Sequence, residues 1–166
     1  VLKGVPVVVV TLVGRSQGLL VSRDNPRGIT GLADLVRADV TFINRQRGSG
    51  TRVLLDFLLH RLGLDPGAIR GYDVEAANHM EVAEAIETGA ADAGMGIEAA
   101  ARARRQGFLP LQDERFDLVV PVDRWDSSEV RGLRAVLASP QFKDSVRGLG
   151  GYDTTHTGAV VTELAG

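Results

Sequence analysis

The densest group of potential ligand-binding side chains lies in residues 44–52, written NRQRGSGTR. This stretch joins an apolar run, DVTFI (39–43), to an amphipathic run, VLLDFLLHRLG (53–63). A strand that leads directly into a helix delivers the unpaired N–H groups and partial positive charge of the helix N-terminus. Glycines let a ligand approach the backbone, while hydroxyl and guanidinium groups add further donors. The pattern therefore predicts a cradle for an anion.

Two other kinds of loop do not fit these residues. A nucleotide-binding P-loop needs a lysine before its serine or threonine, whereas here Gly50 precedes Thr51. Ser49 lacks the flanking spacing of a nucleophile elbow, so no covalent role is expected for it. The remaining alternative is an arginine-rich loop whose serine or threonine only caps the helix.

A second group of donors is predicted at the start of another helix. Asn78 has the position of an N-cap, and Glu81 follows three residues later, as in a capping box. Asn78 and His79 would then direct their donors into the same cleft. The alternative is an ordinary cap next to a surface histidine.

The sequence contains no constellation of residues that indicates catalysis or metal binding. His60, His79 and His156 lie far apart, and none has ligand spacing with a carboxylate, so no metal site is predicted. Asp92 has the surroundings of a structural hydrogen-bond acceptor, and Glu114 precedes a predicted strand. We therefore predict no catalytic residue and no cofactor.

Composition excludes several classes of protein. The chain has 166 residues, a net charge of −2 and no cysteine, which excludes disulfide scaffolds and thiolate metal sites and gives no general attraction to nucleic acid. The longest apolar run, VPVVVVTLV (5–13), is too short to span a bilayer and lacks the features of a signal peptide. The chain begins at Val1 rather than methionine, which indicates a piece of a longer protein. A cytoplasmic location is expected, or a periplasmic one if the parent protein carries a signal peptide.

Strand and helix signals alternate along the chain. Strands are expected at residues 5–13, 18–22, 39–43 and 116–122, and a short strand or turn at 91–97. Helices are expected at about 30–36, 51–62, 79–88 and 98–106, from Ser128, and after Ser139 and Pro140. This alternation predicts an α/β fold with a largely parallel sheet. Ligands bind such sheets beyond the carboxyl ends of strands, where NRQRGSGTR lies.

Four blocks of the sequence follow one another in the order seen in a known family. They are GRSQGLLVSRDNPRGITGLADL, TFINRQRGSGTRVLLDFLL, ADAGMGIEAAARA and ERFDLVVPV. The chain resembles, over nearly its whole length, the PBP-like domains related to type II periplasmic substrate-binding proteins. Within that family it is similar to modules fused to molybdopterin biosynthesis proteins or to helix-turn-helix regulators.

The resemblance implies two α/β lobes with mostly parallel sheets and a ligand between them. Residues 40–113 would form lobe II, while residues 1–39 and 114–166 would form lobe I. Family members usually begin with further strand–helix units, so lobe I is expected to be incomplete at its N-terminus. An incomplete sheet exposes an edge, which favours a homodimer.

The resemblance also implies a ligand and a role. The ligand would be an oxyanion such as molybdate or tungstate, and the chain would be a sensor module that reports to a fused or partner domain. The anion-binding residues would be Arg47, Ser49, Gly50, Thr51, Arg52, Asn78 and His79 from one lobe, and Arg15 and Gln17 from the other. The alternatives are a substrate-binding component of an anion uptake system, an accessory domain of a molybdopterin biosynthesis enzyme, and a binder of a small organic ligand such as an amino acid. No direct nucleic-acid or membrane partner is expected.

Overall fold

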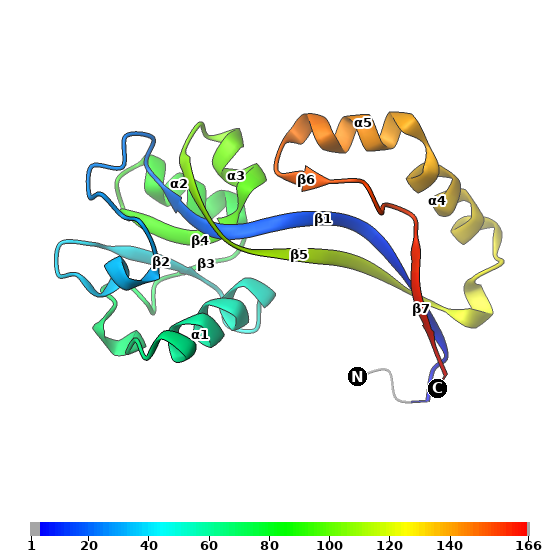
Figure 1. Ribbon diagram of the computed structural model, residues 1–166, viewed down its shortest axis with the longest axis horizontal. Helices are drawn as coiled ribbons and strands as arrows, with labels where there is room; N and C mark the ends of the chain where they lie inside the picture. The colour runs from blue at the N-terminus through cyan, green and yellow to red at the C-terminus, as the bar shows by residue number, and fades with distance from the viewer. Residues whose placement is uncertain (1–3, 166) are drawn as a thin grey trace. The chain divides into compact units, whose positions relative to one another are not determined.

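The computed structural model describes residues 4–165, and the chain divides into two compact units (Figure 1). Unit 1 comprises Val1–Arg15 and Asp113–Gly166, and unit 2 comprises Ser16–Gln112. The chain passes between the units within two long strands, β1 (Val7–Val21) and β5 (Gly107–Pro121). Each strand therefore contributes one part to each unit.

This division differs from the expected lobe boundary after residue 39. Residues 16–39 belong to unit 2, because the second part of β1 and the short helix η1 (Leu32–Val36) contribute to its core. The expected separate strands at 5–13 and 18–22 form one continuous strand. Gly18 allows β5 to lie close to β1, because a Cβ there would lie 2.2 Å from the carbonyl oxygen of Leu109.

The sheet of unit 2 is mixed. Strand β2 (Phe42–Arg45) runs parallel to β3 (Glu75–Ala76) and to β4 (Ala93–Ile97). The second part of β1 pairs antiparallel with β4, from Gln17 opposite Ile97 to Val21 opposite Ala93. The predicted α/β class is confirmed: the strand order β3-β2-β4-β1-β5 begins with two parallel pairs, β3–β2 and β2–β4, and β4 then pairs antiparallel with β1.

Helices cover this sheet and close a continuous apolar core. They are α1 (Gly50–Leu62), η2 (Pro66–Ala68), α2 (His79–Glu87) and α3 (Glu98–Ala103). The side chains of Leu35, Phe42, Leu55, Leu59 and Met95 are each at most 1% exposed. Burial of this apolar surface stabilises the strand ends that carry the polar residues.

The predicted helix ends are mostly found where the sequence placed them. Gly63 ends α1 in the left-handed conformation, at φ 67°. Asn78 Oδ1 accepts the N–H groups of Met80 and Glu81, and the Glu81 carboxylate accepts the Ala77 N–H at 2.7 Å. The helix expected to start at Thr30 begins instead at Leu32.

In unit 1, more strand residues are exposed and fewer side chains are buried than in unit 2. The first part of β1 pairs antiparallel with β7 (Val160–Leu164) and β6 (Tyr152–Asp153), neither of which was predicted. Three helices, η3 (Val122–Arg124), α4 (Ser128–Ala138) and α5 (Pro140–Leu149), follow β5. Ser139 caps α5 as predicted. Among residues 4–165, no helix has the length and apolar character needed to cross a membrane.

Candidate functional site

Two helix N-termini lie at the same edge of the unit 2 sheet. Strands β2 and β3 are parallel neighbours, with Arg45 opposite Ala76. Helix α1 follows β2 and helix α2 follows β3, with Ser49 and Asn78 as their N-caps. Because the carboxyl ends of parallel strands meet at one edge, the positive ends of both helix dipoles are placed together there.

The turn between β2 and α1 leaves its backbone open. Gly48 has φ 86°, a conformation that other residues rarely adopt, and Ser49 N donates to Gln46 O at 3.2 Å. Ser49 Oγ accepts the N–H of Arg52 at 3.2 Å, so its own proton is free to donate elsewhere. A Cβ at Gly48 or Gly50 would meet no atom within 4 Å.

The first N–H groups of α1 are suited to an external acceptor. At a helix N-terminus the leading N–H groups have no acceptor within the helix, and here these belong to Gly50 and Thr51. Gly50 is exposed, whereas Thr51 is 4% exposed and fixes the first turn against the protein. The turn can therefore donate hydrogen bonds from both backbone and side chain, and its role as an anion cradle stays a prediction.

Arg45 is a buried guanidinium beside this turn that the sequence analysis did not select. It is the last residue of β2 and is 7% exposed. Its Nε lies 3.3 Å from Ala76 O, its Nη2 donates to Ala77 O at 3.0 Å, and its Nη1 lies 2.9 Å from His79 Nδ1. The one available signal was its place as the first arginine of NRQRGSGTR, directly after the apolar strand.

Arg52 lies in a network on the flank of α1. Its guanidinium stacks on the ring of Tyr72 at 4.1 Å, and its Nε donates to the Asp56 carboxylate at 3.0 Å. Its Nη1 lies 3.8 Å from Glu75 Oε1, and its side chain is 6% exposed. Burial, together with the 2.5 Å hydrogen bond to Asp56, raises the pKa of Tyr72. These contacts fix the first turn of α1 against the segment that precedes β3.

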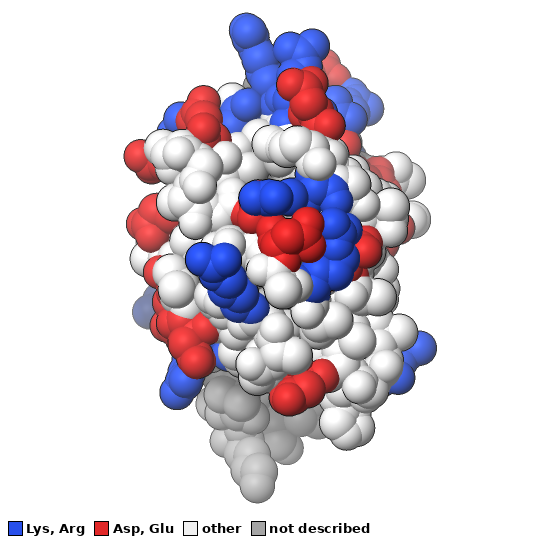
Figure 2. All heavy atoms as spheres, turned by 90° about the vertical axis from the view of Figure 1, so that its left-hand side faces the viewer, with Lys and Arg blue, Asp and Glu red and all other residues white. Residues whose placement is uncertain are grey.

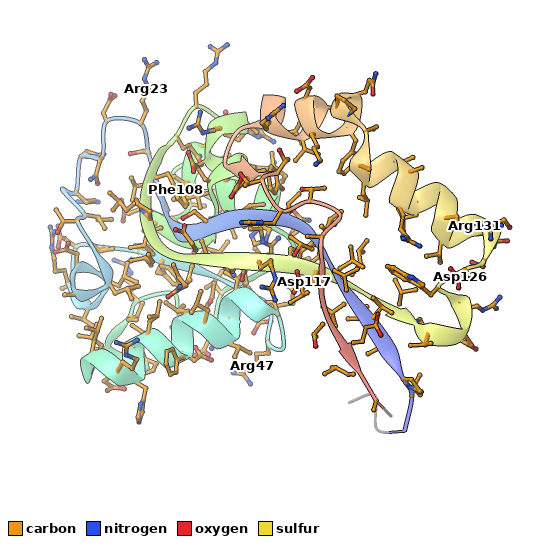
Figure 3. The ribbon with its side chains drawn as sticks, turned by 45° about the vertical axis from the view of Figure 1, so that its right-hand side comes forward. Arg23, Arg47, Phe108, Asp117, Asp126 and Arg131 are labelled. Carbon is orange, nitrogen blue, oxygen red and sulfur yellow. The ribbon has the colours of Figure 1, made fainter. Side chains whose placement is uncertain are left out.

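Arg47 and Asn78 have other contacts in the structure. The Arg47 side chain is 76% exposed, points outward from the turn and forms ion pairs with Asp73 and Glu75 (Figure 3). The amide of Asn78 is used in its own cap, because its nitrogen donates to Glu81 Oε1 at 2.7 Å. These contacts direct neither side chain into the turn, so the anion-binding roles of Arg47 and Asn78 remain predictions.

Arg15 and Gln17 belong to different units. Arg15 lies in unit 1, pairs with Glu114 and stacks on the ring of Phe116 at 4.6 Å. Gln17 lies in β1 of unit 2, opposite Ile97, and is 1% exposed. The structure thus brings Arg45, the turn and His79 together within unit 2, and the role of Arg15 remains a prediction.

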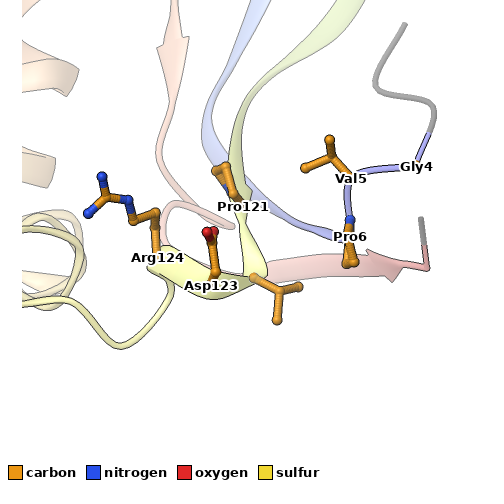
Figure 4. Close-up of a pocket in the computed structure, with 7 residues that line it drawn as sticks. Gly4, Val5, Pro6, Pro121, Asp123 and Arg124 are labelled. Carbon is orange, nitrogen blue, oxygen red and sulfur yellow. The ribbon is translucent and has the colours of Figure 1, made fainter.

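Charged side chains and a hollow elsewhere in the chain can be compared with the turn. Positive and negative side chains are interleaved on the face shown in Figure 2, which gives no extended track for a nucleic-acid backbone. Within residues 4–165, no group of histidine and carboxylate side chains could hold a metal ion. A hollow of about 560 Å³ lies in unit 1, where Gly4–Pro6 faces residues 121–124 (Figure 4). It is open and is lined mainly by proline, valine and backbone, so it lacks the converging donors of the turn.

Comparison with known sequences identifies relatives of the chain. A sequence model of the PBP superfamily domain matches residues 1–138. The protein YvgK of Bacillus subtilis (strain 168) is 39% identical over 163 residues, which cover 98% of this chain and 52% of YvgK. The chain thus spans about half the length of that relative. A protein from the 5′ region of a 2Fe-2S ferredoxin gene of Clostridium pasteurianum is 38% identical over 113 residues, 68% of this chain and 100% of that protein.

Solved structures show the same fold at low sequence identity. A substrate-binding domain assigned to a molybdenum ABC transporter from Clostridium difficile matches with a TM-score of 0.63 and 17% identity, over 87% of this chain and 66% of that one. PEB3 bound to L-phospholactate matches with a TM-score of 0.59 and 16% identity, over 87% of this chain and 68% of the PEB3 chain. A protein assigned as an L-cystine ABC transporter from Listeria monocytogenes matches with a TM-score of 0.59 and 16% identity, over 86% of this chain and 61% of the transporter chain.

Proposed function

The chain belongs to the PBP superfamily, and from this premise we propose that it is a ligand-binding module for a small oxyanion, with molybdate or tungstate as the ligand. The family and its periplasmic-binding-protein-like fold agree with the resemblance described above. The observation that carries the proposal is the edge of unit 2 where two helix N-termini and the buried Arg45 meet.

The chemistry of this edge favours an anion that only accepts hydrogen bonds. The N–H groups of Gly50 and Thr51 can only donate, and Arg45 is a permanent cation without an acceptor. The hydroxyl of Ser49 already accepts from Arg52 and is left to donate. Molybdate and tungstate carry two negative charges and no proton at neutral pH, whereas hydrogen phosphate also needs an acceptor for its own proton.

The structural neighbours support this ligand class without being specific to it. One is assigned to molybdenum transport and another holds L-phospholactate, so both support binding of an anion. A cystine transporter in the same group supports the alternative of an amino-acid carboxylate, which could accept the same hydrogen bonds from the turn. We propose a sensor role, as in modules fused to molybdopterin biosynthesis proteins or regulators. An uptake receptor is the second candidate, because two of these neighbours are named as ABC transporters.

The proposal is tested by thermal-shift titration with molybdate, tungstate, sulfate, phosphate and cystine, followed by calorimetry. A ligand that binds only the folded protein raises the melting temperature. We expect molybdate or tungstate to stabilise the chain and phosphate to have less effect, while sulfate, which also carries two charges and no proton, tests whether the size of the anion matters. We also expect Ser49→Ala combined with Thr51→Ala to weaken molybdate binding at least about tenfold, or about 1.4 kcal/mol.

A matched control separates loss of ligand contacts from loss of a helix cap. Ser127 caps α4 in unit 1, accepting the Val130 N–H at 3.3 Å, in the same way that Ser49 caps α1. Ser127→Ala should lower stability slightly and leave molybdate affinity unchanged. The proposal is wrong if the Ser49/Thr51 variant binds molybdate as tightly as the unsubstituted chain, or if cystine alone stabilises it.

A further inference from the structure

Glu75 contacts both ends of the turn that carries the proposed ligand site. It is the first residue of β3, and its Oε1 atom lies 3.6 Å from Arg47 Nε and 3.8 Å from Arg52 Nη1. Arg47 belongs to the turn, and Arg52 is the third residue of α1. One carboxylate oxygen therefore lies against the two arginines that flank residues 48–51 in the sequence.

The contacts of Glu75 balance charge without forming hydrogen bonds. Both distances exceed the roughly 2.7–3.2 Å of an N–H···O hydrogen bond. The Nη1 atom of Arg52 is buried and has no hydrogen-bond partner among the described residues, a state that is costly for a donor. The side chain of Glu75 is 36% exposed, so its carboxylate can be hydrated where it lies or turn further into solvent.

The other carboxylates beside the two arginines are held differently. Asp56 accepts hydrogen bonds from Arg52 Nε at 3.0 Å and from a tyrosine hydroxyl at 2.5 Å, which fix it in place. Asp73 pairs with Arg47 at 3.3 Å, and solvent screens this pair because the two side chains are 80% and 76% exposed. Within residues 4–165, Glu75 is thus the carboxylate that reaches both arginines and can move away without breaking a hydrogen bond.

We propose that Glu75 is an affinity-setting residue of the ligand site, because its carboxylate competes with the anion for the positive charge of Arg47 and Arg52. The inference rests on the proposed function, since it assumes an anion at the turn. Like charges repel, so a bound anion either tolerates the carboxylate or displaces it toward solvent. Part of the binding free energy is lost in both cases, and a higher ligand concentration is needed to fill the site.

The competition is measured by molybdate calorimetry on three variants, with urea unfolding used to verify that each one folds. Glu75→Gln removes the charge at nearly constant size, and we expect the dissociation constant to fall about three- to tenfold. Glu75→Asp keeps the charge and should bind within about twofold of the unsubstituted chain. Glu87→Gln removes a carboxylate that pairs with Arg104 at the other end of α2, and should leave the affinity unchanged. Equal or weaker binding by Glu75→Gln would overturn the proposal, as would the same gain in Glu87→Gln.

A measurement without ligand separates failure of this inference from failure of the proposed function. Side-chain ¹H–¹⁵N spectra at low temperature report the Nη groups of Arg52, whose signals are assigned by their loss in Arg52→Lys. We expect these signals to shift in Glu75→Gln and to stay in place in Glu87→Gln. If Glu75→Gln does not move them, the inference fails even where molybdate binds. If they move but no anion binds either chain, the contact stands, and the competing role fails together with the proposed function.

Discussion

Units 1 and 2 bury their apolar side chains to different extents. In unit 2, Leu19, Leu35 and Leu55 are fully buried in one continuous core. In unit 1, helix α5 has no buried residue, and Leu149 at its end is 63% exposed. Apolar burial is the main source of folding free energy, so unit 2 has much the larger share of it.

Two five-residue strands, one in each unit, differ in burial in the same way. All residues of β4 are buried, and β4 lies between β2 and β1 in the sheet. All residues of β7 are exposed, and β7 pairs with β1. Helices cover both faces of parallel strands, whereas an outer antiparallel strand is held chiefly by its backbone hydrogen bonds. The candidate site therefore stands on tightly packed strand ends, and unit 1 is the more easily opened part of the chain.

The largest expected effect comes from removing side chains from the two regions. Leu55→Ala leaves a cavity in the core of unit 2 and should lower the free energy of unfolding by about 2–5 kcal/mol. Leu149→Ala removes an exposed side chain and should change it by less than about 0.5 kcal/mol. Urea unfolding followed by circular dichroism measures both, and fluorescence of Trp125 follows unit 1 separately. Similar losses for the two variants would remove the basis of the comparison.

A smaller effect is expected from adding a methyl group to a glycine in each unit. Gly71 in unit 2 has φ 91°, and a Cβ there would lie 2.1 Å from Phe42 O, so Gly71→Ala should destabilise the chain by about 2–3 kcal/mol. Gly132 lies inside α4 of unit 1 with no atom within 4 Å of a Cβ, so Gly132→Ala should stabilise it by about 0.5–1 kcal/mol. Thermal unfolding of the two variants, measured side by side, should show shifts of opposite sign. A loss of stability in Gly132→Ala would mean that unit 1 is packed more tightly around α4 than the structure shows.

The smallest effect is expected from one carboxylate in each unit. Hydrogen bonds from the backbone and hydroxyl of Thr30 lower the pKa of Asp34, and those from the hydroxyl and backbone of Thr155 lower the pKa of Asp153. A lowered folded-state pKa contributes stability that is complete above the unfolded value, near 4, and is lost as the pH falls through the folded value. Each contribution should be below about 1 kcal/mol, because solvent screens both groups.

The measurement is the unfolding midpoint of Asp34→Asn and Asp153→Asn between pH 7 and pH 3. The difference from the unsubstituted chain should be constant above about pH 5 and should shrink below pH 4. A difference that stays unchanged down to pH 3 would contradict the assignment of these carboxylates as ionised acceptors.

The sequence predicted the features that depend on neighbouring residues. The caps at Asn78 and Ser139 and the end of α1 at Gly63 are found as expected, because each is decided within one helical turn. Strands β6 and β7 were missed because their partner, β1, lies more than a hundred residues earlier in the chain. Pairing over such a distance leaves no local signal beyond a short apolar run.

The sequence predicted the helix cap in the turn but not the contacts of the turn's arginine side chains. NRQRGSGTR contains three arginines, of which Arg47 and Arg52 were predicted to bind the anion and Arg45 was not. In the structure, Arg45 is buried next to His79, Arg47 is exposed, and Arg52 stacks on Tyr72. These differences depend on β3 and on the segment before it, which lie some twenty to thirty residues further along the chain.

The passage of the chain between the two units also sets the order in which they can form on the ribosome. Unit 2 is one uninterrupted stretch, residues 16–112, whereas unit 1 is assembled from segments on either side of it. All of unit 2 is therefore synthesised before β6 and β7, the partners of the first part of β1, exist. A domain folds as a unit once it has emerged, so the nascent chain would carry a folded unit 2 preceded by an unpaired, valine-rich segment. Pairing of these valines with β7 therefore waits until residues 160–164 have been made.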